Sequence, residues 1–174
     1  MTHQRTVIRQ YIATAIDSAG LVAADRVYQT KTNPHESGGL PAIELVAPQD
    51  TIIGKRSDVP KVYIRGLIIE IDCIAGGKAA EDDANDLSKL IEDLLLPDHS
   101  VGGLAEDVDL ESTVITVDSE GYTATATASM VFLVTYITEH PYIVDDTFNS
   151  AHADWDLAEP DGQIDAQDIL TLPQ

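Results

Sequence analysis

Apolar residues recur along this chain with two periods, and each period predicts a kind of element. In residues 6–18 they fall one, three and four positions apart, which is the spacing of one face of a helix. The same spacing returns in residues 78–96, where Pro97 follows as a stop signal. The pattern therefore predicts two amphipathic helices, one at the beginning of the chain and one near its middle.

Alternation of side chains predicts strands. Residues 61–74, KVYIRGLIIEIDCI, have one face that is more apolar than the other, and we expect the apolar face to pack on a helix. Residues 110–118 and 122–137 alternate as well, and the short connection between them predicts a hairpin. Shorter strands are expected at 26–29 and 42–46.

Two segments between these elements are rich in turn-forming or charged residues. Residues 31–39, KTNPHESGG, and residues 47–60 are both predicted to be loops. After Glu139 the alternation stops, and the rest of the chain is acidic with a single tryptophan. We therefore place a domain at residues 1–139 and an acidic C-terminal extension at residues 140–174.

The strand at residues 122–137 is long enough to project from its domain. Roughly 16 residues would reach ~50 Å, against a usual strand length of about 5–6 residues. Its first half alternates Thr with Ala, and Thr123, Thr125 and Thr127 share one face. We expect this Thr/Ala end to form a hairpin arm against which another chain packs.

Charge divides the chain into two unequal halves. All 10 Lys and Arg residues lie at or before Lys89. The first 89 residues also carry 12 acidic side chains and have a net charge of −2, whereas the last 85 carry 18 acidic side chains and no Lys or Arg. The acidic half must face water, a basic partner, bound cations or a molecule that it repels. Free binding to nucleic acid is not expected, because a net charge of −20 opposes phosphate.

The scarce cations are candidates for contact with the acidic half of an adjacent subunit. They are Lys55, Arg56, Lys61 and Arg65. Exposed ion pairs contribute only about 0–1 kcal/mol each, so such contacts would set register more than affinity. The candidates for an acidic channel or surface are Asp107, Asp109, Glu111, Asp118 and Glu120.

No pattern in the chain points to catalysis, a cofactor or a membrane span. Cys73, the only cysteine, falls on the apolar strand face and is expected to be a small core residue, so no intrachain disulfide is possible. The five histidines lack the spacing of metal ligands, and GKRS at residues 54–57 lacks two essential residues of a phosphate loop. The N-terminus is not a signal peptide, and no apolar run approaches the ~18 residues of a membrane span.

One acidic segment, DWDLAEPDGQIDAQD, partly fits a calcium loop when Gly162 is aligned with the glycine of an EF-hand. Leu157 then falls at the first ligand position, where a carboxylate is required, and Pro160 lies within the loop. An acidic turn is the simpler interpretation, and no metal site is predicted. The carboxylates that fall at ligand positions are Glu159, Asp161, Asp165 and Asp168.

The predicted elements follow the order helix, two strands, long strand, helix and long hairpin. With the segments RVYQT, LPAIELV, VYIRGLIIEIDCIA, AAEDDANDLSKLIEDLLL and ATASMVFLVTYITE, residues 6–139 resemble the tail terminator (minor tail or tail-completion) proteins of long-tailed bacteriophages. The resemblance rests on element order and on the composition of strands and helices. It implies an α+β fold in which a mixed, mostly antiparallel sheet of about five strands is flanked by two helices. The sequence itself adds a long projecting β-hairpin and an acidic C-terminal tail, and the tail departs from the family pattern.

The resemblance also implies a structural role in the virion tail, after assembly in the host cytoplasm. Six copies would form a ring that caps the tail tube, ends polymerisation of the tube protein and presents a surface to the head-side connector. DNA would pass through the ring without being bound, and carboxylates lining the lumen would repel its phosphates. Two alternatives stay open: a head–tail adaptor, and a calcium- or partner-binding module that acts through the acidic tail. An enzyme is not expected.

Overall fold

The computed structural model describes residues 2–23, 25–30, 39–119, 124–140, 150–155 and 166–171. The chain divides into two compact units, Met1–His140 and Pro141–Gln174. In the second unit, β6 (Ser150–Trp155) pairs antiparallel with β7 (Ala166–Thr171). The first unit holds the helices and the main sheet, and it confirms the predicted α+β fold with a mixed, mostly antiparallel sheet.

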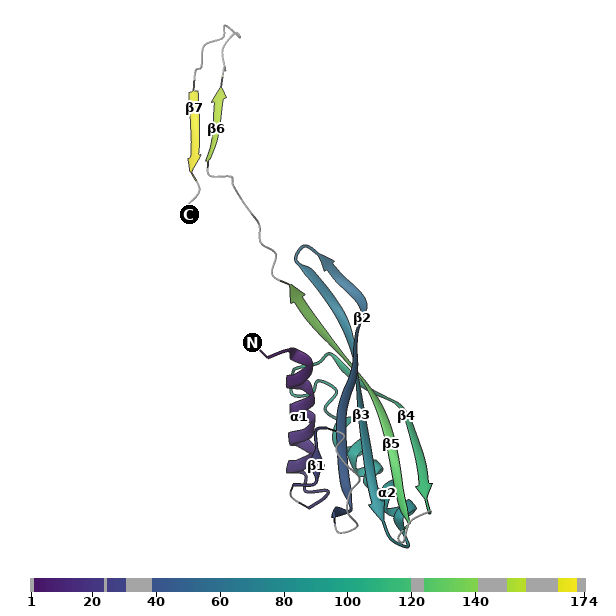
Figure 1. Ribbon diagram of the computed structural model, residues 1–174. Coiled ribbons are helices and arrows are strands. Elements are labelled where there is room, and N and C mark those ends of the chain that lie inside the picture. Colours follow the sequence, from purple (N-terminus) through teal and green to yellow (C-terminus); the bar gives the residue numbers. More distant parts are fainter. Residues whose placement is uncertain are drawn as a thin grey trace. The chain divides into compact units, whose positions relative to one another are not determined.

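The main sheet has five strands in the order β1-β2-β3-β5-β4 (Figure 1). Only β1 and β2 run parallel to each other, and every other neighbouring pair is antiparallel. The two long central strands, β3 and β5, pair along their whole lengths. The strands are β1 (Val27–Tyr28), β2 (Ala42–Asp58), β3 (Lys61–Gly76), β4 (Asp107–Asp118) and β5 (Thr125–His140).

Two helices cover one face of the sheet, as their apolar stripes predict. Helix α1 (Gln4–Ser18) contacts β1 and β2, and α2 (Ala80–Leu95) contacts β3, β5 and β4. The Nδ1 atom of His3 caps α1 by accepting a hydrogen bond from the Arg5 amide at 3.3 Å. The first turn of α2 carries three acidic residues, which the helix dipole favours at that end.

The hydrophobic core lies between the helices and this face of the sheet. Alternate side chains of β3, from Leu67 to Cys73, are fully buried, and so are the matching side chains of β5 from Ala128 to Tyr136. The prediction that this face of β3 packs on a helix is therefore confirmed. Side chains on the opposite face of these two strands are mostly half-buried.

The prediction of a loop at residues 47–60 is wrong, because β2 continues to Asp58 and only Val59 and Pro60 form the turn to β3. Three register irregularities interrupt the pairing of β2 with β3, the first between Val46 and Gln49. Each extra residue shifts the following side chains to the other face, so a continuous strand loses its sequence alternation.

The projecting hairpin is built from β2 and β3, not from the Thr/Ala end of β5. Thr125 and Thr127 pair with β3 on one side and with β4 on the other, and the alanines between and after them are buried. Strand β4 begins opposite Thr135, so the last residues of β5 pair with β3 alone. We call the three-stranded extension formed by residues 50–58, 61–66 and 135–140 the arm; it reaches past the end of α1 (Figure 1).

Candidate interaction surfaces

A nearly buried carboxylate joins the three strands at the base of the arm. The side chain of Asp50, from β2, is only 2% exposed. Its two oxygens accept hydrogen bonds from Nε and Nη2 of Arg65, both at 3.0 Å, and Oδ2 also accepts one from the Tyr136 hydroxyl at 3.0 Å. The hydrogen bond to Asp50 raises the pKa of Arg65, whereas burial, followed by Asp50, raises the pKa of Tyr136 to about 12. The cluster therefore links β2, β3 and β5 at the point where the arm leaves the domain.

Most charges near the end of the arm are paired within the chain. Lys55 pairs with Asp58, and Nη1 of Arg56 lies 2.7 Å from Oε1 of Glu106. Lys61 is exposed, and no ion pair is found for it among the residues that the structure describes. Pairing therefore neutralises much of the arm, and Arg65 is not available to a partner.

Apolar side chains of the arm are left uncovered. Ile52 and Ile53 are each 55% exposed, and Val59 at the turn is 65% exposed. Ile53 leans over Gly66, where an added Cβ would lie 3.1 Å from it and 3.1 Å from Leu133. Such exposed apolar groups on a projecting element mark a surface for protein contact.

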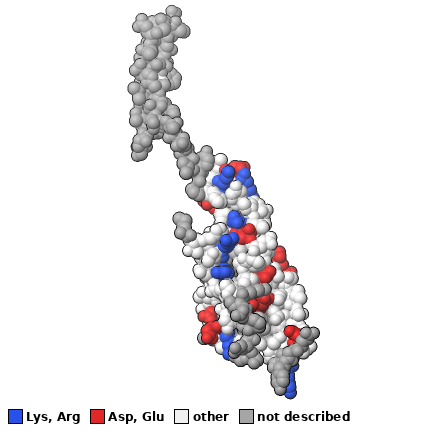
Figure 2. Space-filling view, in the orientation of Figure 1, with Lys and Arg blue, Asp and Glu red and all other residues white. Residues whose placement is uncertain are grey.

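Charges of opposite sign lie on the outer strand β4 and at the start of α1. The outer strand β4 has four carboxylates and no basic residue. At the other edge, Arg5 and Arg9 of α1 line a hollow of about 350 Å³ beside Ala47 and Pro48 of β2. In Figure 2, basic side chains lie near the N-terminal end of α1 and on the arm, and acidic ones lie on the arm and over the middle and lower end of the sheet.

The sequence pattern predicted no contact role for Arg5 and Arg9. They lie four positions apart on α1, so they share one side of the helix. Neither forms an ion pair with any residue in the described part of the chain, and the buried Nε of Arg9 has no hydrogen-bond partner there. Their helical spacing was a usable signal, but the pattern alone did not place them beside a sheet edge.

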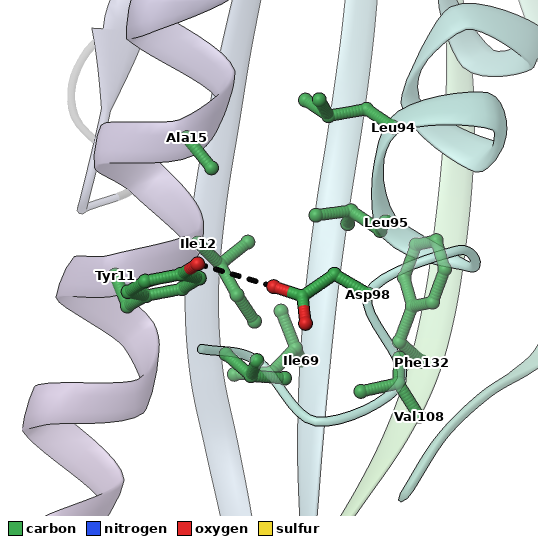
Figure 3. Close-up of a pocket in the computed structure, with 10 residues that line it drawn as sticks. Tyr11, Ile12, Ala15, Ile69, Leu94, Leu95, Asp98, Val108 and Phe132 are labelled. Carbon is green, nitrogen blue, oxygen red and sulfur yellow. Dashed lines mark hydrogen bonds between the residues drawn. The ribbon is translucent and has the colours of Figure 1, made fainter. Parts of the chain in front are cut away.

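An apolar cavity of about 180 Å³ lies between the two helices. Its walls include Ile12, Leu95 and Phe132. Tyr11 and Asp98 point toward each other at its mouth, where the Tyr11 hydroxyl donates to Oδ2 of Asp98 at 3.1 Å (Figure 3). Burial opposes ionisation of Asp98, but hydrogen bonds from Ser100, Tyr11 and the Gly102 amide outweigh it and lower its pKa. The cavity holds no arrangement of nucleophile and base.

The remaining predicted site residues are dispersed. Asp107, Asp109, Glu111 and Asp118 are all exposed on β4, whereas Glu120 and Thr123 lie outside the described residues. Of the calcium-loop candidates, Glu159, Asp161 and Asp165 also lie outside them, and Asp168 pairs with Ala153 in the β6–β7 hairpin. Within the described ranges, no group of three potential metal ligands is found, and no helix is long and apolar enough to cross a membrane.

The single cysteine is part of the core. Cys73 is fully buried on the helix side of β3, and burial, followed by the charge of Asp72, raises the pKa of its thiol to about 12. A thiol with such a pKa is almost entirely protonated near neutral pH and is a poor nucleophile. This agrees with the expectation that Cys73 is a packing residue.

Comparisons with protein-family models and with curated protein sequences found no match to this chain. Function is therefore inferred from the arm, from the exposed side chains and from the distribution of charge.

Proposed function

We propose that this protein is a structural component of a phage tail, whose copies form a hexameric ring on the end of the tail tube. The ring ends polymerisation of the tube protein, provides the surface to which the head-side connector attaches, and lets DNA pass. The proposal joins the resemblance of residues 6–139 to tail terminators with the features of the arm and the charge of the chain.

The arm is the observation that carries the proposal. It continues the sheet beyond the helical layer, it is fixed at its base by the Asp50–Arg65 pair, and it exposes Ile52, Ile53 and Val59. A rigid element of this kind loses little conformational entropy when it packs on a neighbour, so its contacts retain more of their free energy. Ring subunits need such an element, because each copy must reach the next.

The charge of the chain supports the passage of DNA. At −20 per copy, six copies form a strongly acidic assembly. The first two turns of α2 alone expose Glu81, Asp82, Asp83 and Asp86. Carboxylates facing a channel would repel phosphates, so DNA would slide without sticking.

The proposal is tested by assembly of the full chain. Size-exclusion chromatography with light scattering, alone and with purified tail tube protein, is expected to give a species of six chains of 18.7 kDa, and negative-stain microscopy to show rings on tube ends. Tubes grown with the protein should be shorter than tubes grown without it, because capped ends no longer add tube protein. A chain that stays monomeric and leaves tube growth unchanged contradicts the proposal.

A head–tail adaptor remains the second candidate, because the same arm and charge would serve a ring on the head side. Deletion of the gene from its phage separates the two roles. Loss of a terminator gives overlong tails, whereas loss of an adaptor gives tails of normal length without heads.

A further inference from the structure

We propose that neighbouring copies join head to tail through the two opposite edges of the sheet. The acidic edge strand β4 of one copy lies against the α1–β2 edge of the next, where Arg5 and Arg9 face Asp109 and Glu111. This inference rests on the proposed ring and assigns the surfaces that build it.

The α1–β2 edge offers two arginines to an acidic partner. Arg5 is exposed and Arg9 half-buried, and the hollow that they line beside Pro48 is open to solvent on the described surface. The buried Nε of Arg9 has no acceptor among the described residues. A buried guanidinium donor without an acceptor is unfavourable, so a rotation of the half-buried Arg9 side chain that brings it to a carboxylate of a second copy would be favoured.

The β4 edge offers the matching carboxylates. Asp109 and Glu111 are exposed, and no ion pair joins either to another residue in the described part of the chain. A register shift between Leu110 and Ser112 leaves Glu111 as the extra residue, so Asp109 and Glu111 do not follow the regular alternation of the strand. Arg5 and Arg9 are ~6 Å apart along α1, and either carboxylate is a candidate partner for either arginine.

Both edges also expose apolar side chains that such a contact would cover. On β4, Val114 is 58% exposed and Val117 is 48% exposed. On the β2 side, Ile52 and Ile53 are each 55% exposed. Burial of apolar area supplies most of the free energy of an interface, whereas charge complementarity selects the partner and the register.

Opposite edges favour a head-to-tail contact over a symmetric one. Pairing β4 with β4 of a second copy would bring two sets of carboxylates together without any cation. Strand β2 has irregular register and Pro48 at its outer edge, features that prevent simple strand addition. A contact between unlike surfaces repeats from copy to copy, and it closes into a ring when its rotation divides a full turn.

This contact changes the role predicted for part of β4. It moves Asp109 and Glu111 from the channel to the subunit interface, and Asp107 lies beside them on the same strand. The exposed carboxylates at the start of α2 are then the ones available to face the channel.

Reciprocal charge reversal tests the inference. The full chain carrying Arg5→Glu and Arg9→Glu, or Asp109→Lys and Glu111→Lys, is expected to assemble at least about tenfold more weakly by light scattering or sedimentation. In an equimolar mixture, each α1–β2 edge meets a β4 edge of opposite charge only on the other variant, so the mixture should form rings in which the two variants alternate. The four-substitution chain should recover ring formation by itself. Lys78→Glu with Lys89→Glu is the control that changes charge equally at other sites.

The outcomes separate this inference from the proposed ring. Rings that form normally with either charge-reversed chain, or a four-substitution chain that does not recover, overturn the assigned contact while the ring stands. A wild-type chain that forms no ring, alone or with tube protein, overturns the ring itself. Thermal unfolding followed by circular dichroism verifies that each variant is folded. The variant with Asp109→Lys and Glu111→Lys is expected to fold normally, because both side chains are exposed.

Discussion

At the scale of single residues, the arm depends on one carboxylate. Asp50 is nearly buried and neutralises Arg65, so removal of its side chain leaves a largely buried guanidinium without a partner. Asp50→Ala is expected to lower the free energy of unfolding by about 3 kcal/mol in urea denaturation. The control is Asp93→Ala, which removes a partner of Lys89 from an exposed pair and is expected to change nothing measurable. Equal effects of the two substitutions would show that the cluster at the base of the arm is not structurally important.

Gly102 fixes the loop that closes the cavity between the helices. Its φ of +64° disfavours a side chain, and an added Cβ would lie 2.6 Å from the Tyr11 ring. Gly102→Ala is expected to cost about 2–4 kcal/mol of stability, from backbone strain and overpacking together. Gly103→Ala is the matched control, since Gly103 also has positive φ but no neighbour within 4 Å, and it should cost only about 1–2 kcal/mol. Combining Gly102→Ala with Tyr11→Ala should cost less than the sum of the single changes.

Two buried acids predict a loss of stability at high pH. The folded-state pKa values of Cys73 and Tyr136 are both about 12, above their ordinary values of 9.0 and 10.0. The folded chain therefore keeps two protons that the unfolded chain releases, and the free energy of unfolding should fall as pH rises from about 9 to about 12. Urea denaturation across this range measures the slope. In Cys73→Ala the decline should begin near pH 10, and an unchanged onset would contradict the assignment.

Predictions about single residues are confirmed where the local pattern of the sequence is enough to place the side chain. The place of Cys73 on an apolar strand face follows from alternation alone, and the structure agrees. The pairing of Arg65 with Asp50 was not foreseen, because Asp50 lay in an expected loop, and the partner of Arg56, Glu106, is 50 positions away. Long-range partners depend on strand pairing, which no local pattern specifies.

At the scale of elements, β2 shows how irregular register hides a strand. Its first residues are buried and alternate little, and the later ones include Pro48, Gly54 and charged side chains. Hydrogen bonds to the regular strand β3 hold this segment extended in spite of its weak local preference. The Thr/Ala half of β5 was predicted to be a free arm, but it lies inside the sheet. Its small alanine side chains are buried where β5 packs on α2.

The arm is expected to matter for assembly and not for folding. Val59 is exposed at the turn, so Val59→Asp should leave the melting temperature within about 2 °C of the wild type. The same change should weaken ring formation by placing a charge in a contact of apolar groups, as measured by light scattering over a dilution series. Lys89→Asp, at an exposed site on α2, is the control. If the Val59→Asp chain assembles as fully as the wild type, the turn of the arm does not lie in the interface between copies.

At the scale of the whole molecule, the strand order converts an asymmetry along the chain into an asymmetry in space. The early part of the chain, which holds both signs of charge, supplies α1 and β2 at one edge, and the later part, which has no Lys or Arg, supplies β4 at the other. β5 returns between β3 and β4, so the acidic strand is placed at the outside of the sheet. The result is a subunit with two unlike edges, which suits a repeating contact.

The two compact units are expected to be independent in stability. Every residue of the hydrophobic core cluster lies within Met1–His140. A chain ending at His140 should therefore unfold in one cooperative transition, with a free energy of unfolding within about 1 kcal/mol of that of the full chain. Denaturation of both chains in urea makes the comparison. A larger loss would mean that the second unit stabilises the first.

The sequence by itself determined the two helices, the faces of β3 and the general class of the fold. These features follow from side-chain periodicity, which each segment expresses without its neighbours. Only the tertiary structure decided that residues 47–58 are a strand, that the arm comes from β2 and β3, and that Arg5 and Arg9 lie opposite β4 across the sheet. Those features depend on which strands pair and which edges stay free, and pairing is set by contacts between residues far apart in the chain.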